Sequence, residues 1–453
     1  MTRFFDAERQ PTFTSAVANS AITRRARPFP AVLFFFALVG VMSRGAFEIV
    51  VGKTAAYGVQ TGLLTLFLIA VLLLGRPTST KRLGWSMLAL FILVLVALLS
   101  AFVTLEISGS SSAVIYIAVM LFFAVLLVVF GSTEFHFTHT ERMGPPIVIV
   151  VVASIAVALL QQFAGLTIFP GSDFGTFGTT ARPSGLTGSF LHYPIAIAIL
   201  GFVLLGIASV RRRWIYGFVG VAAFVAVLIS YSRSGMVLVL VGVAVGVLLA
   251  HGVNARFRLL TAAVLGAIGF VIAVPTTDFI DRFLSIIDSD GAGNETRIRA
   301  WERVLALWSD SAILFGSHTG EFTNVTQNLS ELDSAGVAES SVLQLMINFG
   351  LLGTVAFYAL LFIAVAATPR VPQWFRAGMI AALVQGLFYQ SVEVLPYMAA
   401  LSLTPFIASQ IVQAPRIIMP TGDSIARSPR TGAGSLTNIG TDRYSPRDRR
   451  PPR

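Results

Sequence analysis

Long apolar stretches constrain this chain more than any other feature of its sequence. About twelve of them occur between residues 29 and 413, and each is close to the roughly 20 residues that cross a bilayer as a helix. Helices are expected rather than strands, because a helix satisfies its own backbone inside lipid and the alternation of a barrel strand is absent. The sequence therefore predicts an all-α polytopic membrane protein. The predicted spans are residues 29–47, 57–75, 84–103, 112–130, 145–163, 190–208, 214–231, 234–250, 257–275, 341–367, 374–392 and 397–413.

The composition agrees with this fold class. Charged residues make up 12% of the 453 residues, about half the share found in a soluble domain, and the mean hydropathy is +0.80. So little charge cannot cover a water-facing surface, which excludes a soluble enzyme, a DNA-binding domain and a disordered protein. The chain has no cysteine, so a disulfide framework, a thiolate metal site and a cysteine nucleophile are excluded as well.

The basic residues predict the orientation in the membrane. With a cytoplasmic N-terminus, 24 of the 32 Lys and Arg residues fall on the inner side, as the positive-inside rule requires. The net charge of +10 then reflects topology, and no nucleic-acid partner is expected. We expect residues 1–28 to form a cytoplasmic tail before an uncleaved first span. Residues 414–453, rich in Arg, Ser, Pro and Gly, are predicted to be a disordered tail on the anionic inner leaflet.

This topology contains one long outer segment, residues 276–340. It separates nine spans in residues 29–275 from three spans in residues 341–413, and long connections of this kind usually carry function. The segment holds 11 of the 22 acidic residues. It also predicts an amphipathic helix at the outer membrane interface, because apolar side chains recur there at spacings of three and four. These side chains are Ile298, Trp301, Leu305 and Trp308.

The positive-inside rule does not predict arginines on the outer side, so each of them calls for an explanation. Arg182, Arg233 and Arg297 are of this kind. A guanidinium group binds pyrophosphate through paired hydrogen bonds and stays charged, so the functional interpretation is an anion site. The alternative is snorkelling or an ion pair with an outer acid. Arg233 favours the anion site most, because it lies in a turn between two spans with small polar neighbours and no acid nearby.

Two other outer residues are candidates for the chemistry. Glu339 stands at the start of the tenth span, where a carboxylate can act as a base or can be a helix N-terminal acid favoured by the macrodipole. His192 begins a span and can line a site or fill a structural role. The other histidines carry no pattern that indicates a site. No nucleotide-binding, zinc-protease or serine-hydrolase motif occurs, so no metal and no cofactor are expected.

Four short motifs follow one another between residues 180 and 355. They are Arg182 followed by Gly185 and Gly188, the turn Ser230–Gly235 with the pattern Ser-x-Ser-Arg-x-Gly, Arg297 with Trp301 four residues on and then Leu314–Gly316, and Glu339–Leu343 ahead of Gly350–Gly353. Each is nonspecific alone. Their order, spacing and shared outer placement resemble the O-antigen ligase and polymerase family of bacterial membrane proteins.

The resemblance implies a multi-pass glycosyltransferase of the inner (cytoplasmic) membrane. Such proteins take a glycan from undecaprenyl pyrophosphate on the outer face and transfer it to an acceptor glycan or lipid, with no nucleotide or required metal. Catalysis is assigned by resemblance to Arg233 and Glu339. Because Glu339 replaces the histidine of the family motif, a polymerase-like or divergent member is favoured over a lipid A ligase. The residues assigned to substrate binding are Arg182, His192, Arg233, Arg297 and Trp301.

Two other functions are weighed against this one. A transporter or flippase would need ionisable residues in mid-span and favours repeated halves, and the sequence has neither. A noncatalytic scaffold would not explain why arginines cluster on one face. In every case the bilayer is a partner. The glycosyltransferase interpretation adds a lipid-linked glycan and its acceptor.

Overall fold

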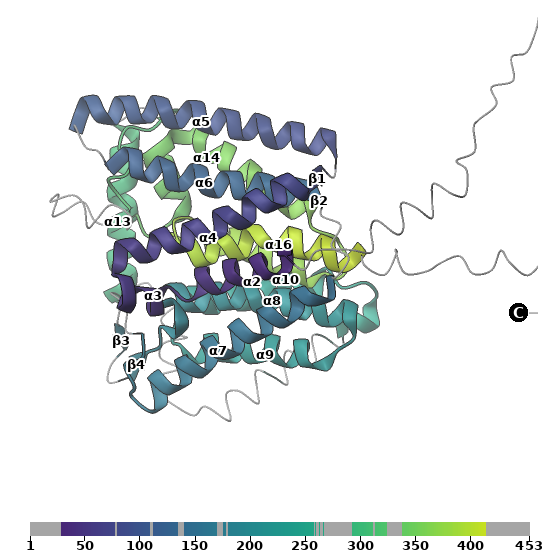
Figure 1. The fold of residues 1–453 in the computed structure, drawn as a ribbon. Helices are drawn as coiled ribbons and strands as arrows, with labels where there is room; N and C mark the ends of the chain where they lie inside the picture. Colours follow the sequence, from purple (N-terminus) through teal and green to yellow (C-terminus); the bar gives the residue numbers. More distant parts are fainter. Residues whose placement is uncertain are drawn as a thin grey trace, which may run out of the picture. The chain divides into compact units, whose positions relative to one another are not determined.

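The computed structural model describes residues 29–77, 79–108, 112–134, 140–169, 175–177, 180–257, 292–310, 313–323 and 338–413, with single positions at 259, 262 and 266. These residues are almost entirely helical (Figure 1). The helices are α2 (Phe29–Met42), α3 (Arg44–Val51), α4 (Lys53–Leu74), α5 (Thr80–Ser108), α6 (Ser112–Ser132), α7 (Gly144–Phe163), α8 (His192–Arg211), α9 (Trp214–Ile229), α10 (Arg233–Leu248), α13 (Ala292–Ser309), α14 (Ser341–Ala367), α15 (Trp374–Gln385) and α16 (Leu395–Gln413).

Short non-helical pieces connect some of these helices. Two antiparallel strand pairs and two single-turn 3-10 helices occur in the described ranges. They are the pair of β1 (Arg76–Pro77) with β2 (Thr133–Glu134), which α5 and α6 separate in the chain, the hairpin of β3 (Gly175–Phe177) with β4 (Thr180–Arg182), and the 3-10 helices η1 (Thr140–Met143) and η2 (Gly185–Thr187).

The all-helical membrane class is confirmed. Eleven of the twelve predicted stretches coincide with a helix, and the twelfth, residues 257–275, lies outside the described residues apart from four positions. The predicted tails, residues 1–28 and 414–453, and much of the segment 276–340 also lie outside them.

The number of membrane crossings is smaller in the part of the chain that the structure describes. Seven helices there are long and apolar enough to span a bilayer, or eight if the bent pair α2 and α3 counts as one. The helices α9 and α10 have 16 residues each, because the chain turns sharply between them. The helix α15 ends after 12 residues, where a non-helical stretch begins. The length of an apolar stretch in the sequence does not reveal such breaks.

The first predicted span is bent rather than straight. The helices α2 and α3 meet at Ser43 with an angle of 75°. The first residue of α3 is Arg44, whose guanidinium bonds the Glu48 carboxylate one turn later. A charged pair inside an apolar run needs polar surroundings, and the bend places it against the η2 segment.

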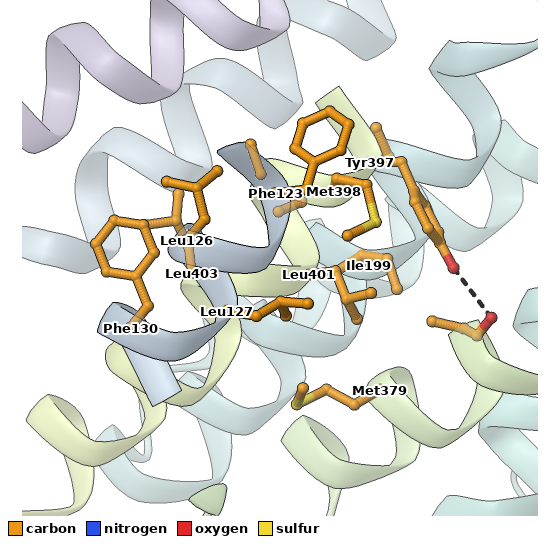
Figure 2. Packing of buried hydrophobic residues seen from close by; sticks show 14 of the residues in the cluster. Phe123, Leu126, Leu127, Phe130, Ile199, Met379, Tyr397, Met398, Leu401 and Leu403 are labelled. Carbon is orange, nitrogen blue, oxygen red and sulfur yellow. Dashed lines mark hydrogen bonds between the residues drawn. The ribbon is translucent and has the colours of Figure 1, made fainter. Parts of the chain in front are cut away.

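The helices α8 and α16 form the centre of the helix bundle. The buried shares of their apolar stretches are 78% and 89%, against 33% for α4, α5 and α7, which show large apolar side chains on their surface as lipid-facing helices do. Figure 2 shows Leu127 of α6, Ile199 of α8 and Leu401 of α16 in this core. The Tyr397 hydroxyl donates a hydrogen bond to the Ala382 carbonyl over 3.0 Å and ties α16 to α15.

The segments that connect the long helices lie in two groups, one at each end of these helices. In Figure 1, α3, the β3–β4 hairpin and α13 lie at one end (left in the view), and the paired strands β1 and β2 lie at the other. The first group is the one predicted to be outside and the second is the one predicted to be inside. This grouping agrees with the predicted alternation of the spans, and the side of the membrane that each end faces stays a prediction.

Single introduced cysteines test that orientation, because the chain has none of its own. We expect Ser309→Cys, at the exposed end of α13, to react with a membrane-impermeant thiol reagent in intact or outer-membrane-permeabilised cells. Arg213→Cys, in the exposed connection before α9, should react only after lysis. The reverse pattern of labelling would show that the orientation is inverted.

Candidate active site

The end of α7 holds the segment that follows Arg182. The side-chain oxygen of Gln161 accepts hydrogen bonds from the backbone N–H groups of Ser184 and Gly185, both over 2.9 Å, and its amide nitrogen donates to the Ser184 hydroxyl over 3.0 Å. The Arg182 guanidinium lies over the Phe190 ring, 4.1 Å from its centroid. Phe190 is two residues before α8. These contacts attach the first arginine motif to the start of α8.

The second arginine motif is a tight turn between α9 and α10. Tyr231 has a left-handed backbone (φ 55°), and Ser232 caps α10 by accepting a hydrogen bond from the Gly235 N–H over 3.3 Å. Arg233 is the first residue of α10. Gly235 packs so closely on α8 that an added Cβ would lie 2.9 Å from Cβ of Pro194. This turn therefore also packs against the first turn of α8.

Two adjacent glutamines join the two motifs. Gln161 binds the segment after Arg182, and the neighbouring Gln162 donates a hydrogen bond to the carbonyl of Ile229 over 2.8 Å, at the end of α9 just before the second turn. No sequence pattern assigns a role to these glutamines. Their importance depends on which segments meet at the end of α7, and only the tertiary structure shows that.

His192 is buried at the same helix start and is part of a polar cluster. Nη1 of Arg44 lies 3.3 Å from Nδ1 of His192, and because arginine can only donate, this imidazole nitrogen is the acceptor. The same guanidinium pairs with Glu48 at 2.6 Å and lies over the Tyr57 ring at 4.7 Å. The arrangement favours the structural alternative for His192, as the residue that joins α8 to α3.

Glu339 and Arg297 form the core of a second group of predicted residues. Nε of Arg297 on α13 lies 3.3 Å from Oε2 of Glu339, and their side chains are 23% and 32% exposed. Glu339 has a left-handed backbone (φ 52°), and its N–H donates to the side-chain oxygen of Gln390 over 3.3 Å. Ser340, not Glu339, caps α14. Glu339 therefore stands before the helix and is not an acid of its first turn.

Trp301 lies one turn beyond Arg297 on α13. Within the described part of the chain, its indole Nε1 is buried and has no hydrogen-bond partner. The amphipathic helix is present as predicted. Val304 is buried, whereas Ile298 and Leu305 are 40% and 43% exposed. Exposed apolar side chains on this helix agree with the predicted place at the membrane interface, which stays a prediction.

A kink in α14 connects the outer segment to the membrane helices. Gly350 has φ 62° and interrupts the helix, so nearby backbone groups lose their helical partners. The segment 313–323 replaces them. The N–H groups of Leu351 and Leu352 donate to the carbonyls of Ile313 and Leu314 over 2.9 and 3.2 Å. The Thr319 hydroxyl donates to the Asn348 carbonyl over 2.9 Å. This part of the loop is therefore held by α14 itself.

A buried carboxylate lies behind Glu339. Glu393 is 4% exposed, and its oxygens accept hydrogen bonds from the side-chain amides of Gln344, over 3.0 Å, and Gln390. Gln390 also binds the Glu339 backbone, so this network positions the second group. The sequence places Glu393 only near the outer end of a span. In the described ranges, no three His, Asp or Glu side chains gather closely enough to hold a metal ion.

The comparison with known families agrees with these motifs. Residues 218–358 match the model of the O-antigen ligase family. The matched segment contains Arg233, Arg297, Trp301 and Glu339, and it leaves out Arg182 and His192. The match confirms the resemblance to the O-antigen ligase and polymerase family, and the long apolar helices indicate a multi-pass membrane protein. No curated protein matches the chain.

Replacing Gly350 tests whether the kink maintains the site. A Cβ at this position would lie 2.3 Å from the carbonyl carbon of Leu314, and the left-handed backbone strains any other L-residue. We expect Gly350→Ala to lower the unfolding temperature in detergent, corresponding to a loss of about 1–3 kcal/mol. Gly62→Ala is the control, because this helical glycine has nothing near its Cβ position. Equal unfolding temperatures for the two variants would contradict the role given to the kink.

Proposed function

We propose that this protein is a membrane glycosyltransferase that transfers or polymerises a glycan carried on undecaprenyl pyrophosphate, at the outer face of the cytoplasmic membrane. The observation that carries the proposal is the attachment of both arginine motifs to the first turn of α8, where Gln161 and Gln162 hold them. The match of residues 218–358 to the O-antigen ligase family supports a transferase over a transporter.

The arginines supply the electrostatic part of this mechanism. Arg182 and Arg233 would each hold the pyrophosphate through paired N–H donors. When the bond between the sugar C1 and the phosphate oxygen breaks, negative charge develops on that oxygen. Donors already in place stabilise this charge without reorganisation, and a water-poor site strengthens the effect. Gln161 and Gln162 contribute by fixing the backbone that presents the two guanidinium groups.

The second group suits the acceptor. The Arg297–Glu339 pair is partly exposed and offers charged donors and acceptors, and Trp301 adds an aromatic surface with a buried N–H that lacks a partner among the described residues. Sugars are bound by such combinations of hydrogen bonds and aromatic contact. The base role of Glu339 stays a prediction. Its ion pair supports the other role considered from sequence, which is to hold the acceptor by hydrogen bonds, because one carboxylate oxygen already faces Arg297.

Lysine substitutions test the anion site. Arg182→Lys and Arg233→Lys keep the charge but lose the planar fork, so we expect each to lower glycan transfer by about tenfold or more at matched membrane expression. Transfer is measured as surface glycan formed in a deletion strain that carries each variant. Arg299→Lys is the control, because the Arg299 side chain is 73% exposed and pairs only with the exposed Glu295 of its own helix among the bonds described. Unchanged transfer in both test variants would argue against the pyrophosphate site.

Glu339→Gln separates the two roles of this residue. Glutamine keeps the hydrogen bonds but cannot take a proton, so a positioning role predicts a loss of transfer below about tenfold, whereas loss of a base costs about 10²–10⁴ in rate. We expect the smaller loss, and a larger one for Glu339→Ala. Glu302→Gln, exposed on α13, is the matched control. A fall of about 10² or more with Glu339→Gln, with the donor still bound, would assign the base role to Glu339.

A further inference from the structure

The loop segment held by the α14 kink contains a histidine–carboxylate pair. Nδ1 of His318 lies 2.7 Å from Oε2 of Glu321, and the two side chains are 21% and 17% exposed. A backbone hydrogen bond from the Glu321 N–H to the His318 carbonyl, over 3.2 Å, closes the turn between them. No sequence pattern assigns a role to either residue.

The pairing determines which imidazole nitrogen can act as a base. An ionised carboxylate only accepts hydrogen bonds, so Nδ1 of His318 carries the proton that it donates to Glu321. In the neutral ring this leaves the lone pair on Nε2. No described residue hydrogen-bonds to Nε2, and the ring is partly exposed. A carboxylate on Nδ1 with Nε2 open to the substrate is the arrangement that orients a histidine for general-base catalysis.

The surroundings hold this pair firmly. The His318 N–H donates to the Ile347 carbonyl over 3.4 Å. The next residue, Thr319, is bound on both sides: its N–H donates to the Thr104 hydroxyl over 2.9 Å, and its own hydroxyl donates to the Asn348 carbonyl over 2.9 Å. A base must be held in place to act efficiently, and these contacts come from membrane helices rather than from the loop itself.

The pair also adjoins the group proposed to bind the acceptor. The His318 ring meets the Phe322 ring edge-on, with centroids 5.9 Å apart. Phe322 belongs to a small buried cluster with Val304 of α13, Ala338 and Ile347 of α14. Ala338 directly precedes Glu339. The cluster therefore connects the histidine to the segment that carries the Arg297–Glu339 pair.

The other candidate bases in the described residues are less suitable. Glu339 has one oxygen facing Arg297. Nδ1 of His192 accepts from Arg44, and that ring is only 9% exposed. Both oxygens of the buried Glu393 accept from glutamine amides. His318 alone among these four combines an oriented ring, an open nitrogen and partial exposure.

We propose that His318 is the general base that activates the acceptor hydroxyl and that Glu321 positions it, a role that rests on the proposed transferase function. Nε2 takes the hydroxyl proton as the acceptor oxygen forms a bond to C1 of the donor sugar. The bond from C1 to the phosphate oxygen breaks, and its electron pair leaves with the pyrophosphate at Arg182 and Arg233. The imidazolium is stabilised by Glu321 and then releases its proton to water.

The test uses full-length protein in membranes, with undecaprenyl-pyrophosphate-linked glycan as the probe. His318→Gln should lower transfer by about 10²–10⁴-fold while donor binding and the unfolding temperature stay close to wild type. Glu321→Gln should lower transfer less, because glutamine can still accept from Nδ1 but cannot stabilise the imidazolium. Added imidazole should partly restore His318→Ala, which a purely structural residue with the donor still bound would not show. His251→Gln, an exposed histidine elsewhere in the chain, is the matched control.

The possible failures are distinguishable. A wild-type protein that binds the donor but never transfers glycan would refute the transferase function itself. An active wild type with near-normal His318→Gln would overturn only the role of His318, and a deep loss in Glu339→Gln beside it would make Glu339 the base. If His318→Gln unfolds early, Glu321→Gln decides, because normal transfer in that variant would also overturn the proposal.

Discussion

Backbone polar groups that leave a helix within lipid must find partners inside the protein, and the rest of this structure depends on that constraint. Gly350 breaks α14 and frees several backbone groups. The loop segment 313–323 supplies their partners, so part of the outer segment becomes an extension of the membrane domain. At the end of α7, Gln161 satisfies the backbone of the segment after Arg182 in the same way. Both groups of polar residues in this protein lie where a helix ends or is interrupted, because backbone N–H and C=O groups need new partners there.

This constraint explains why a chain with few charged residues has two clusters of polar side chains. The arginine motifs meet at the start of α8, and the Arg297–Glu339 pair lies before α14. In the proposed function, the first group would supply cations for an anionic leaving group. The second would supply hydrogen-bonding and aromatic surfaces for a sugar, with His318 beside it. That division would suit the proposed transfer from a lipid-linked donor to an acceptor, since the developing negative charge and the departing proton need opposite chemical surroundings.

Sequence patterns were reliable where the signal is local. Apolar length identified eleven helices, and outward-facing arginines in small polar turns indicated the motifs that the family match then supported in part. The patterns failed where a break or a distant contact decides. The bend at Ser43 and the short helix α15 are not visible in apolar length. The ion pair between Arg297 of α13 and Glu339 is likewise not visible in the apolar spacing of this helix.

The sequence by itself determined the membrane class, the expected orientation, and the residue types available for an anion site, because hydrophobic length and charge asymmetry act locally along the chain. Only the tertiary structure decided which of these residues work together. In the sequence, Gln161 is simply a polar residue near a helix end, and its contact with Ser184 appears only in the structure. His192 likewise contacts Arg44, which is 148 positions away in the sequence. Such contacts depend on how interrupted helices pack and form hydrogen bonds with one another's backbone groups, and a local pattern in the sequence contains no information about that packing.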